Sequence, residues 1–145
     1  MIFREANIDD VEQIQRVRNA VKENMLSNPN LVTDQDCIDF ISVGGKGWVC
    51  QTHNQIVGFS IVDLKENNVW ALFVNPNFEK KGIGRQLHDT MMNWYFLQTQ
   101  NKIWLSTDSN TRAEQFYRKS GWVEVEINNI REIKFKMTYQ KWKKC

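Results

Sequence analysis

The chain has 145 residues, 41% of them hydrophobic, with six Trp and a formal net charge of +2. That length is sufficient for one domain whose hydrophobic core needs no disulfide or metal to hold it. The small net charge argues against a general electrostatic affinity for nucleic acid. We expect a cytoplasmic protein without membrane contact, because the sequence has neither a signal-peptide pattern nor an apolar run long enough to span a bilayer.

The three cysteines are Cys37, Cys50 and Cys145, an odd number whose spacings fit neither a disulfide set nor a zinc site. We expect free thiols in a reducing cytosol. Cys50 and His53 supply at most half of a metal site, because no second pair of ligands accompanies them. The sequence therefore predicts that no metal is bound.

The first predicted elements are a short strand over residues 1–6 and a helix. Asp9 and Glu12 form a plausible capping box, and an apolar stripe continues from Val11 to Met25. The Asn-Pro-Asn segment at 28–30 is expected to end this helix.

A second helix is predicted to start with Thr33 and Asp36 and to stop at Gly44 and Gly45. The Gly-Gly-Lys-Gly run at 44–47 is interpreted as a turn into the next strand. Six further strands are then predicted, at 48–52, 55–64, 69–74, 102–107, 123–127 and 133–139. A loop and long helix occupy 79–99, and a shorter helix occupies 110–120.

The most informative segment is 74–85, in which an apolar strand ends, a basic glycine loop follows and a helix begins. A helix N-terminus leaves four backbone N–H groups unpaired and carries about half a positive charge, so it attracts phosphate. Gly82 and Gly84 let the backbone approach an anion, and Lys80, Lys81 and Arg85 add positive charge. A Gly-x-Gly pair is also common in a plain strand-to-helix turn, and this loop matches neither the dinucleotide nor the nucleoside-triphosphate template.

The second informative segment is 109–122. Ser109 or Asn110 is expected to cap its helix and Gly121 to end it. Asn110, Ala113 and Tyr117 share one helix face, where an amide, a small residue and a phenol could hold a narrow polar ligand. In isolation, core packing explains Ala113 and Tyr117 better.

Together and in this order, the two segments resemble motifs of the Gcn5-related N-acetyltransferase (GNAT) family. The loop is similar to the family's pyrophosphate motif, Gln/Arg-x-x-Gly-x-Gly/Ala, and the helix to its Asn-x-x-Ala-x-x-x-Tyr-x-x-x-Gly-Phe motif. The strand ending at Pro76 also fits. Glu79 departs from the pattern, because the family usually carries Gln or Arg there, and a carboxylate would slightly oppose the phosphates.

The resemblance implies a single N-acetyltransferase domain over residues 1–145. Its fold would be α/β (α+β), with a mixed, mostly antiparallel sheet of about seven strands, a splayed strand pair and four flanking helices. Dimerisation is common for such folds, so a homodimer is possible, although the sequence indicates no interface.

The resemblance also implies a binding site for acetyl-CoA as co-substrate. The pantetheine arm would pair with the strand, Asn110 would hydrogen-bond it, and Tyr117 would face the thioester sulfur as a hydrogen-bond donor. The expected cofactor-binding residues are Leu72, Phe73, Val74, Lys80, Lys81, Gly82, Ile83, Gly84, Arg85, Asn110 and Ala113.

The acceptor is expected to be a primary amine of a small molecule or peptide, which needs a base to become neutral. Asp108 is the candidate base, although it serves equally well as a turn residue before the next helix. Glu23 and His53 are weaker candidates. The acceptor site is expected between the first two helices and the strand ends, with walls from Arg18, Asn19, Glu23, Trp70 and Trp104.

Arg18 lies at the edge of an apolar stripe, so it either meets an acidic group of the substrate or snorkels to solvent, and we expect snorkelling. An alternative to an enzyme is a non-catalytic acyl-CoA-binding module with the same fold. A weaker alternative is a nucleic-acid or membrane contact through Lys136 and the basic segment 141–144, which we otherwise expect to be a solvated end.

Overall fold

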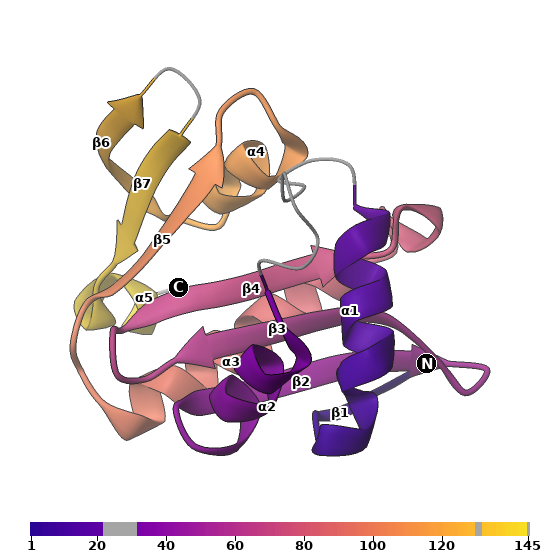
Figure 1. Cartoon of the computed structure of the whole chain (residues 1–145). Helices are drawn as coiled ribbons and strands as arrows, with labels where there is room; N and C mark the ends of the chain where they lie inside the picture. Colours follow the sequence, from indigo (N-terminus) through magenta and orange to yellow (C-terminus); the bar gives the residue numbers. More distant parts are fainter. Residues whose placement is uncertain (22–31, 130–131, 145) are drawn as a thin grey trace.

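Seven strands form one mixed sheet in the order β1-β2-β3-β4-β5-β7-β6, as Figure 1 shows. The computed structural model describes residues 1–21, 32–129 and 132–144. The strands are β1 (Ile2–Glu5), β2 (Gly45–Thr52), β3 (Gln55–Asp63), β4 (Asn68–Val74), β5 (Ile103–Asp108), β6 (Val123–Asn129) and β7 (Glu132–Met137). The α-helices in the described ranges are α1 (Val11–Ala20), α2 (Asp34–Ser42), α3 (Ile83–Gln98), α4 (Arg112–Lys119) and α5 (Tyr139–Lys143). The short 3₁₀ helices in those ranges are η1 (Ile8–Asp10) and η3 (Pro76–Phe78).

The sheet opens between β4 and β5. These two strands are parallel and pair only at Asn68 and Trp104, near the start of each strand, whereas the other neighbouring strands are antiparallel. Figure 1 shows β5 leaving β4 toward β7 and β6. Since parallel strands end at the same edge, the carboxyl ends of β4 and β5 diverge around a gap. This is the splayed pair that the sequence resemblance predicts.

Each face of the sheet carries its own apolar cluster. The cluster under α1 and α2 includes Ile14, Val17 and Phe59, all nearly or fully buried. The cluster under α3 and α4 includes Leu87, Met91 and other apolar side chains. In Figure 1, α1 and α2 lie in front of the sheet and α3 lies behind it. The helical periodicity of the sequence thus corresponds to helices packed on both faces.

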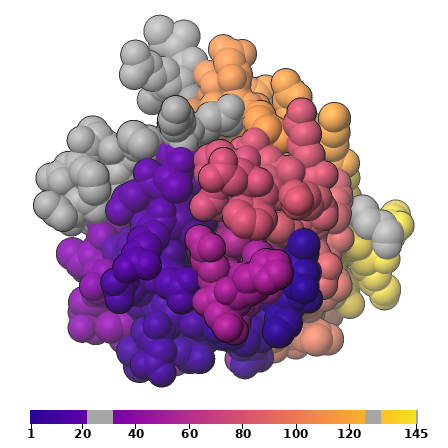
Figure 2. All heavy atoms as spheres, turned by 90° about the vertical axis from the view of Figure 1, so that its right-hand side faces the viewer, coloured from indigo at the N-terminus to yellow at the C-terminus, as the bar shows by residue number. Residues whose placement is uncertain are grey.

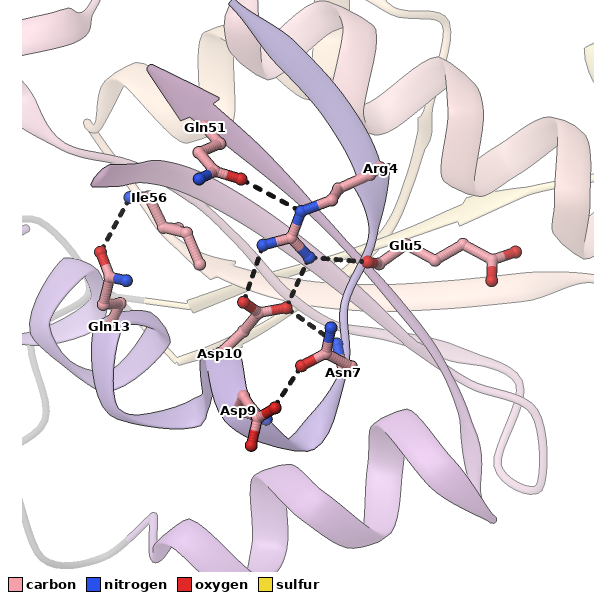
Figure 3. A network of polar contacts seen from close by, with 8 residues as sticks. All are labelled: Arg4, Glu5, Asn7, Asp9, Asp10, Gln13, Gln51 and Ile56. Atoms are coloured by element: carbon pink, nitrogen blue, oxygen red, sulfur yellow. Dashed lines mark hydrogen bonds and ion pairs between the residues drawn. The ribbon is translucent and has the colours of Figure 1, made fainter. Parts of the chain in front are cut away.

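A network of polar contacts fixes the start of α1 on the sheet (Figure 3). The Arg4 guanidinium donates to both carboxylate oxygens of buried Asp10, at 2.8 and 2.9 Å, and to Gln51 Oε1 at 3.1 Å. The Arg4 hydrogen bonds hold the pKa of Asp10 below its ordinary value. Farther along the helix, Gln13 Oε1 accepts from the backbone N–H of Ile56 at 2.9 Å. These contacts orient α1 so that its C-terminal end reaches the open part of the sheet.

The capping prediction for the first helix is wrong by two residues. Asn7 and Asp10 form the capping box, and it belongs to η1, which leads directly into α1. The helix ends at Ala20, because Val21 is already extended, and the expected continuation to Met25 lies outside the described residues. The Thr33–Asp36 capping box of α2 is confirmed.

The C-terminal basic segment forms a helix that the sequence interpretation did not include, although Lys141, Lys143 and Lys144 are exposed as expected of a solvated end. Thr138 caps α5, a fifth helix that the sequence reading missed. Its Trp142 packs against the α3 side of the core, and Trp142 Nε1 donates to Asn93 Oδ1 on α3 at 2.9 Å. β7 therefore ends at Met137, two residues before the predicted strand end.

Candidate active site

A cleft of about 390 Å³ lies where β4 parts from β5. Its walls come from the end of β4, from the loop and first turn of α3, from α4, and from Val21 after α1. Figure 2 views the side toward which β4 points in Figure 1, and there the pink surface around residue 80 lies between the indigo N-terminal residues and the orange α4 region. The predicted site residues that line the cleft are Leu72, Phe73, Val74, Lys80, Gly82, Ile83, Gly84, Arg85, Ala113 and Tyr117. Sequence reasoning missed Val21, Phe78, Arg112 and Phe116, which also line it.

The loop before α3 presents unpaired backbone donors to this cleft. Lys80 has a φ of 64° and Gly82 a φ of 80°, so both lie in the left-handed region. Gly82 is the N-cap, and no side chain caps the helix. Among the described residues, no backbone amide from 80 to 85 donates a hydrogen bond to another backbone group. A helix N-terminus in this state fits phosphate oxygens, which would accept from these amides.

The start of α3 is held close to the sheet at Gly58 on β3. A Cβ at Gly58 would stand 3.1 Å from both Ile83 Cγ2 and Leu87 Cδ1. Such contacts are tighter than ordinary packing, so the missing side chain allows the helix to approach β3. This close approach sets the position of the amides at the mouth of the cleft.

Glu79 is paired with Arg112 of α4, and both residues line the cleft. The unusual carboxylate at position 79 is therefore neutralised by a guanidinium 33 residues away. Arg85 lies with its guanidinium carbon 5.2 Å from the centre of the Phe116 ring. Lys81 is exposed and does not line the cleft.

The N-cap of helix α4 lies one residue after Asn110 and two after Ser109, the two predicted caps. Thr111 is the N-cap, and its hydroxyl accepts from the backbone N–H of Glu114 at 3.2 Å. Asn110 precedes the helix with a φ of 60° and donates its backbone N–H to Glu114 Oε1 at 2.8 Å. The structure thus brings Ala113 and Tyr117 to the cleft but leaves Asn110 exposed and outside its lining. The φ of 94° at Gly121 confirms the expected helix end.

Tyr117 is the buried phenol of the cleft, with 6% of its surface exposed. Its ring packs edge-on against Phe116 and Trp122 and tilted against Phe135, with centroids 5.4 to 6.3 Å apart. No described residue forms a hydrogen bond with its hydroxyl. Burial raises the pKa of Tyr117 well above its ordinary value, so the phenol stays neutral and able to donate.

His88 supports this aromatic cluster from α3 and is fully buried. Its Nε2 accepts from Trp122 Nε1 at 3.0 Å, and its Nδ1 lies 2.8 Å from Asp89 Oδ1. Because an indole N–H can only donate, His88 is the neutral tautomer with its proton on Nδ1, and the contact with Asp89 is a hydrogen bond. Burial lowers the pKa of His88 in keeping with that assignment.

The proposed base, Asp108, ends β5 and does not line the cleft. Its backbone carbonyl accepts from Thr111 Oγ1 at 2.7 Å, which ties the end of β5 to the cap of α4. His53 lies in the β2–β3 hairpin turn, where His53 and Asn54 have φ of 51° and 63° as the turn prediction requires. Glu23 lies outside the described residues.

A second hollow, of about 380 Å³, lies beside the sparsely paired strands β4 and β5. Trp70 and Trp104, both predicted walls of the acceptor site, line it together with Ser106 and Lys134. Asn19 is exposed on α1. Arg18 contradicts the snorkelling prediction, because only 9% of its surface is exposed and its guanidinium lies against aromatic rings of the sheet.

Within the described ranges, no group of three or more His, Cys, Asp or Glu side chains has the arrangement to hold a metal ion. The helices of the same residues are too short or too polar to cross a bilayer. Cys37 and Cys50 are free and buried.

A mixed sheet with one splayed parallel pair, and a loop of unpaired amides at the opening, is the fold that the sequence resemblance predicts. A sequence model of the acetyltransferase (GNAT) domain matches residues 44–124, more than half of the chain. The chain therefore belongs to the GNAT acetyltransferase family. No curated protein matches it in sequence.

Solved structures share the fold at low identity. PaiA N-acetyltransferase from Thermoplasma acidophilum, solved with coenzyme A, has a TM-score of 0.81 at 16% identity over 95% of this chain and 98% of its own. Smu.2055 from Streptococcus mutans has a TM-score of 0.80 at 18% identity, over 96% of this chain and 99% of its own. The ribosomal-protein-S18-alanine N-acetyltransferase of Escherichia coli has a TM-score of 0.77 at 14% identity, over 95% of this chain and 93% of its own.

Proposed function

We propose that this protein transfers an acetyl group from acetyl-CoA to a primary amine of a small molecule or peptide. The observation that carries the proposal is a set of backbone amides without backbone partners at residues 80 and 82–85, which line a cleft at the splayed strands. Acetyl-CoA would supply the acetyl thioester. The family membership supports acyl transfer, and the coenzyme A bound to PaiA N-acetyltransferase from Thermoplasma acidophilum supports this choice of co-substrate.

The residues of the cleft fit the two ends of such a molecule. The amides of residues 80–85 and the side chains of Lys80 and Arg85 would hold the pyrophosphate. The backbone of Leu72 to Val74 would pair with the amide groups of the pantetheine arm, because β4 has lost its β5 partner there. Ala113 would leave room for the arm beside α4. Binding at both ends positions the thioester, which is a proximity effect.

Tyr117 would act as a hydrogen-bond donor to the charge that develops on the sulfur. A phenol is a weaker acid than a thiol even before burial raises its pKa, so a complete proton transfer to a thiolate would be uphill. Donation to a developing charge has no such cost. A preorganised donor of this kind typically contributes about 10²-fold or more to turnover.

The amine must lose a proton before it can attack. An alkyl amine of pKa ~10.4 is charged at pH 7, and the neutral form is less stable by roughly 4.6 kcal/mol. We retain Asp108 as the proposed base, acting through water, because it ends the strand that borders the opening. Replacing Asp108 with Asn is expected to lower turnover at neutral pH and to restore part of it at high pH, where the amine is neutral.

The alternative function is a non-catalytic acyl-CoA-binding module with the same fold. The buried phenol at 117 favours the enzyme, because binding alone needs no donor at the sulfur. Mass spectrometry of amines and peptides incubated with acetyl-CoA and the purified full chain tests the proposal. Acetylated product is expected, and binding of acetyl-CoA without product from a broad amine panel would favour the module.

A further inference from the structure

Arg18 is a buried cation that has no anionic partner among residues 1–21, 32–129 and 132–144. It lies in the last turn of α1, and 9% of its surface is exposed. Its Nε and Nη2 atoms are fully covered and have no hydrogen-bond partner in the part of the chain that the structure describes. Among the described residues Arg18 also forms no ion pair. Leaving a charge unpaired away from water costs far more than leaving a neutral group unpaired, so its presence calls for an explanation.

The surroundings of the guanidinium compensate for this cost only in part. Its central carbon lies 5.0 Å from the ring centres of Trp70 and Phe73 and 5.8 Å from that of Phe59. Ring faces attract cations, but they provide no oxygen to accept the N–H groups. The neighbouring titratable group is Cys37, which is a poor counter-ion because burial raises its pKa to about 11.

Arg18 is in the lining of neither hollow, but the aromatic rings that it contacts line both. β4 carries a bulge at which Trp70 has no partner in β3, and both Trp70 and Phe73 reach the α1 side of the sheet. Phe73 and Val21 line the main cleft, whereas Trp70 lines the second hollow. Arg18 therefore lies beside the opening on the α1 side. The amides at 80–85 lie on the α3 and α4 side of the same opening.

We propose that Arg18 binds a carboxylate of the acceptor, so that the substrate is an amino acid or acidic peptide rather than a simple amine. This inference rests on the proposed acetyl transfer. Nε and Nη2 lie on one edge of the guanidinium plane, the edge that holds a carboxylate through two parallel hydrogen bonds. Neither donor on that edge has a partner among the described residues, and because both are covered, a carboxylate would reach them only when the groups that cover them move aside. A carboxylate would supply the missing negative charge and both missing acceptors together.

The test compares amines that differ only in the carboxylate. The probes are β-alanine, 4-aminobutyrate, 5-aminovalerate and 6-aminohexanoate, each beside its own carboxamide, with kcat/KM measured at saturating acetyl-CoA. We expect the wild-type protein to prefer at least one acid over its amide by about 10- to 100-fold, as for a charged hydrogen bond. Arg18→Met is expected to abolish the preference and to leave acetyl-CoA affinity unchanged.

Two controls separate recognition from packing. Arg16→Met removes the same charge from the exposed side of α1, where Arg16 pairs with Glu12, and should leave the preference intact. Arg18→Met should keep or raise the melting temperature, because it removes an unpaired buried charge. Arg18→Lys keeps the charge but lacks the two-donor edge, so it should retain only part of the preference.

Three results would count against the inference. Equal rates for acids and amides in an active wild-type protein would overturn it while leaving acetyl transfer intact. An unchanged preference in Arg18→Met, together with a lower melting temperature, would assign Arg18 to packing. Absence of acetyl-CoA binding and of any acetylated amine would remove the proposed function, and the inference with it.

Discussion

Two buried tyrosines offer a direct separation of catalysis from stability. Tyr117 lines the cleft, and its hydroxyl has no hydrogen-bond partner among the described residues. Tyr95 of α3 is fully buried, and its hydroxyl donates to Asn67 Oδ1 at 2.9 Å with Lys102 O at 3.3 Å. Burial raises the pKa of Tyr95 to about 12, so both phenols are neutral donors at neutral pH. Replacing each tyrosine with Phe should therefore affect a different property: turnover for Tyr117 and stability for Tyr95.

Tyr117→Phe is expected to lower kcat by about 10²-fold, which corresponds to roughly 2.7 kcal/mol of lost stabilisation at the sulfur. Its free energy of unfolding should change by less than about 0.5 kcal/mol, because no hydrogen bond is broken and the ring contacts remain. Tyr95→Phe should lose about 1–2 kcal/mol of stability, since buried acceptors lose their donor. Its kcat should stay near that of the wild type.

The assay for both variants combines steady-state acetylation, titration with acetyl-CoA and urea unfolding. Acetyl-CoA affinity should be retained in each case, since neither hydroxyl belongs to the proposed phosphate-binding site. Full turnover in Tyr117→Phe would refute the role of this phenol. So would a stability loss in Tyr117→Phe equal to that in Tyr95→Phe, because the hydroxyl would then have a structural partner.

Three further outcomes follow from the structure. Gly82→Ala should weaken acetyl-CoA binding about tenfold in titration calorimetry, because a residue with a Cβ costs about 1–2 kcal/mol at a φ of 80°; Gly82→Asn, which tolerates this conformation, should lose less. Glu79→Gln should tighten acetyl-CoA binding a few-fold at low salt, since it removes a carboxylate that lines the cleft, and unchanged affinity would show that this charge is inert. Stability should be intact above about pH 6.5 and fall as the pH drops below it, by at most about 1.4 kcal/mol per pH unit, because burial lowers the pKa of His88. Urea midpoints from pH 7.5 to 5.5 check this, and an equally steep fall in His88→Gln would assign the effect to other groups.

The parts of the site that the sequence predicted correctly depend on local spacing. The sequence predicts the positions of the loop before α3, of the strand ahead of it and of the end of α4 at Gly121 to within a few residues of the observed bounds. The Thr33–Asp36 capping box is local in the same way and is confirmed. Such features follow from backbone chemistry that a short window contains.

The features that the sequence did not reveal are long-range. Glu79 meets Arg112 only because the loop and α4 face each other across the cleft. Arg18 is buried because the bulge at Trp70 and the packing of α1 bring aromatic rings over it, whereas the helical pattern alone places it at the edge of a stripe.

The fifth helix, α5, was missed because it is short and rich in lysine. Its docking depends on Trp142, whose indole N–H donates to Asn93 on α3. A local sequence pattern cannot predict this contact, because the two residues are 49 positions apart.

Isothermal titration of the purified full chain with acetyl-CoA and with desulfo-CoA tests the anion-binding cleft most directly. Binding of both compounds is predicted, because in the proposal the amides at 80–85 would hold phosphates that the two compounds share. Binding of neither would show that the glycine loop is only a turn between β4 and α3. The proposed acetyl transfer would then be contradicted along with it.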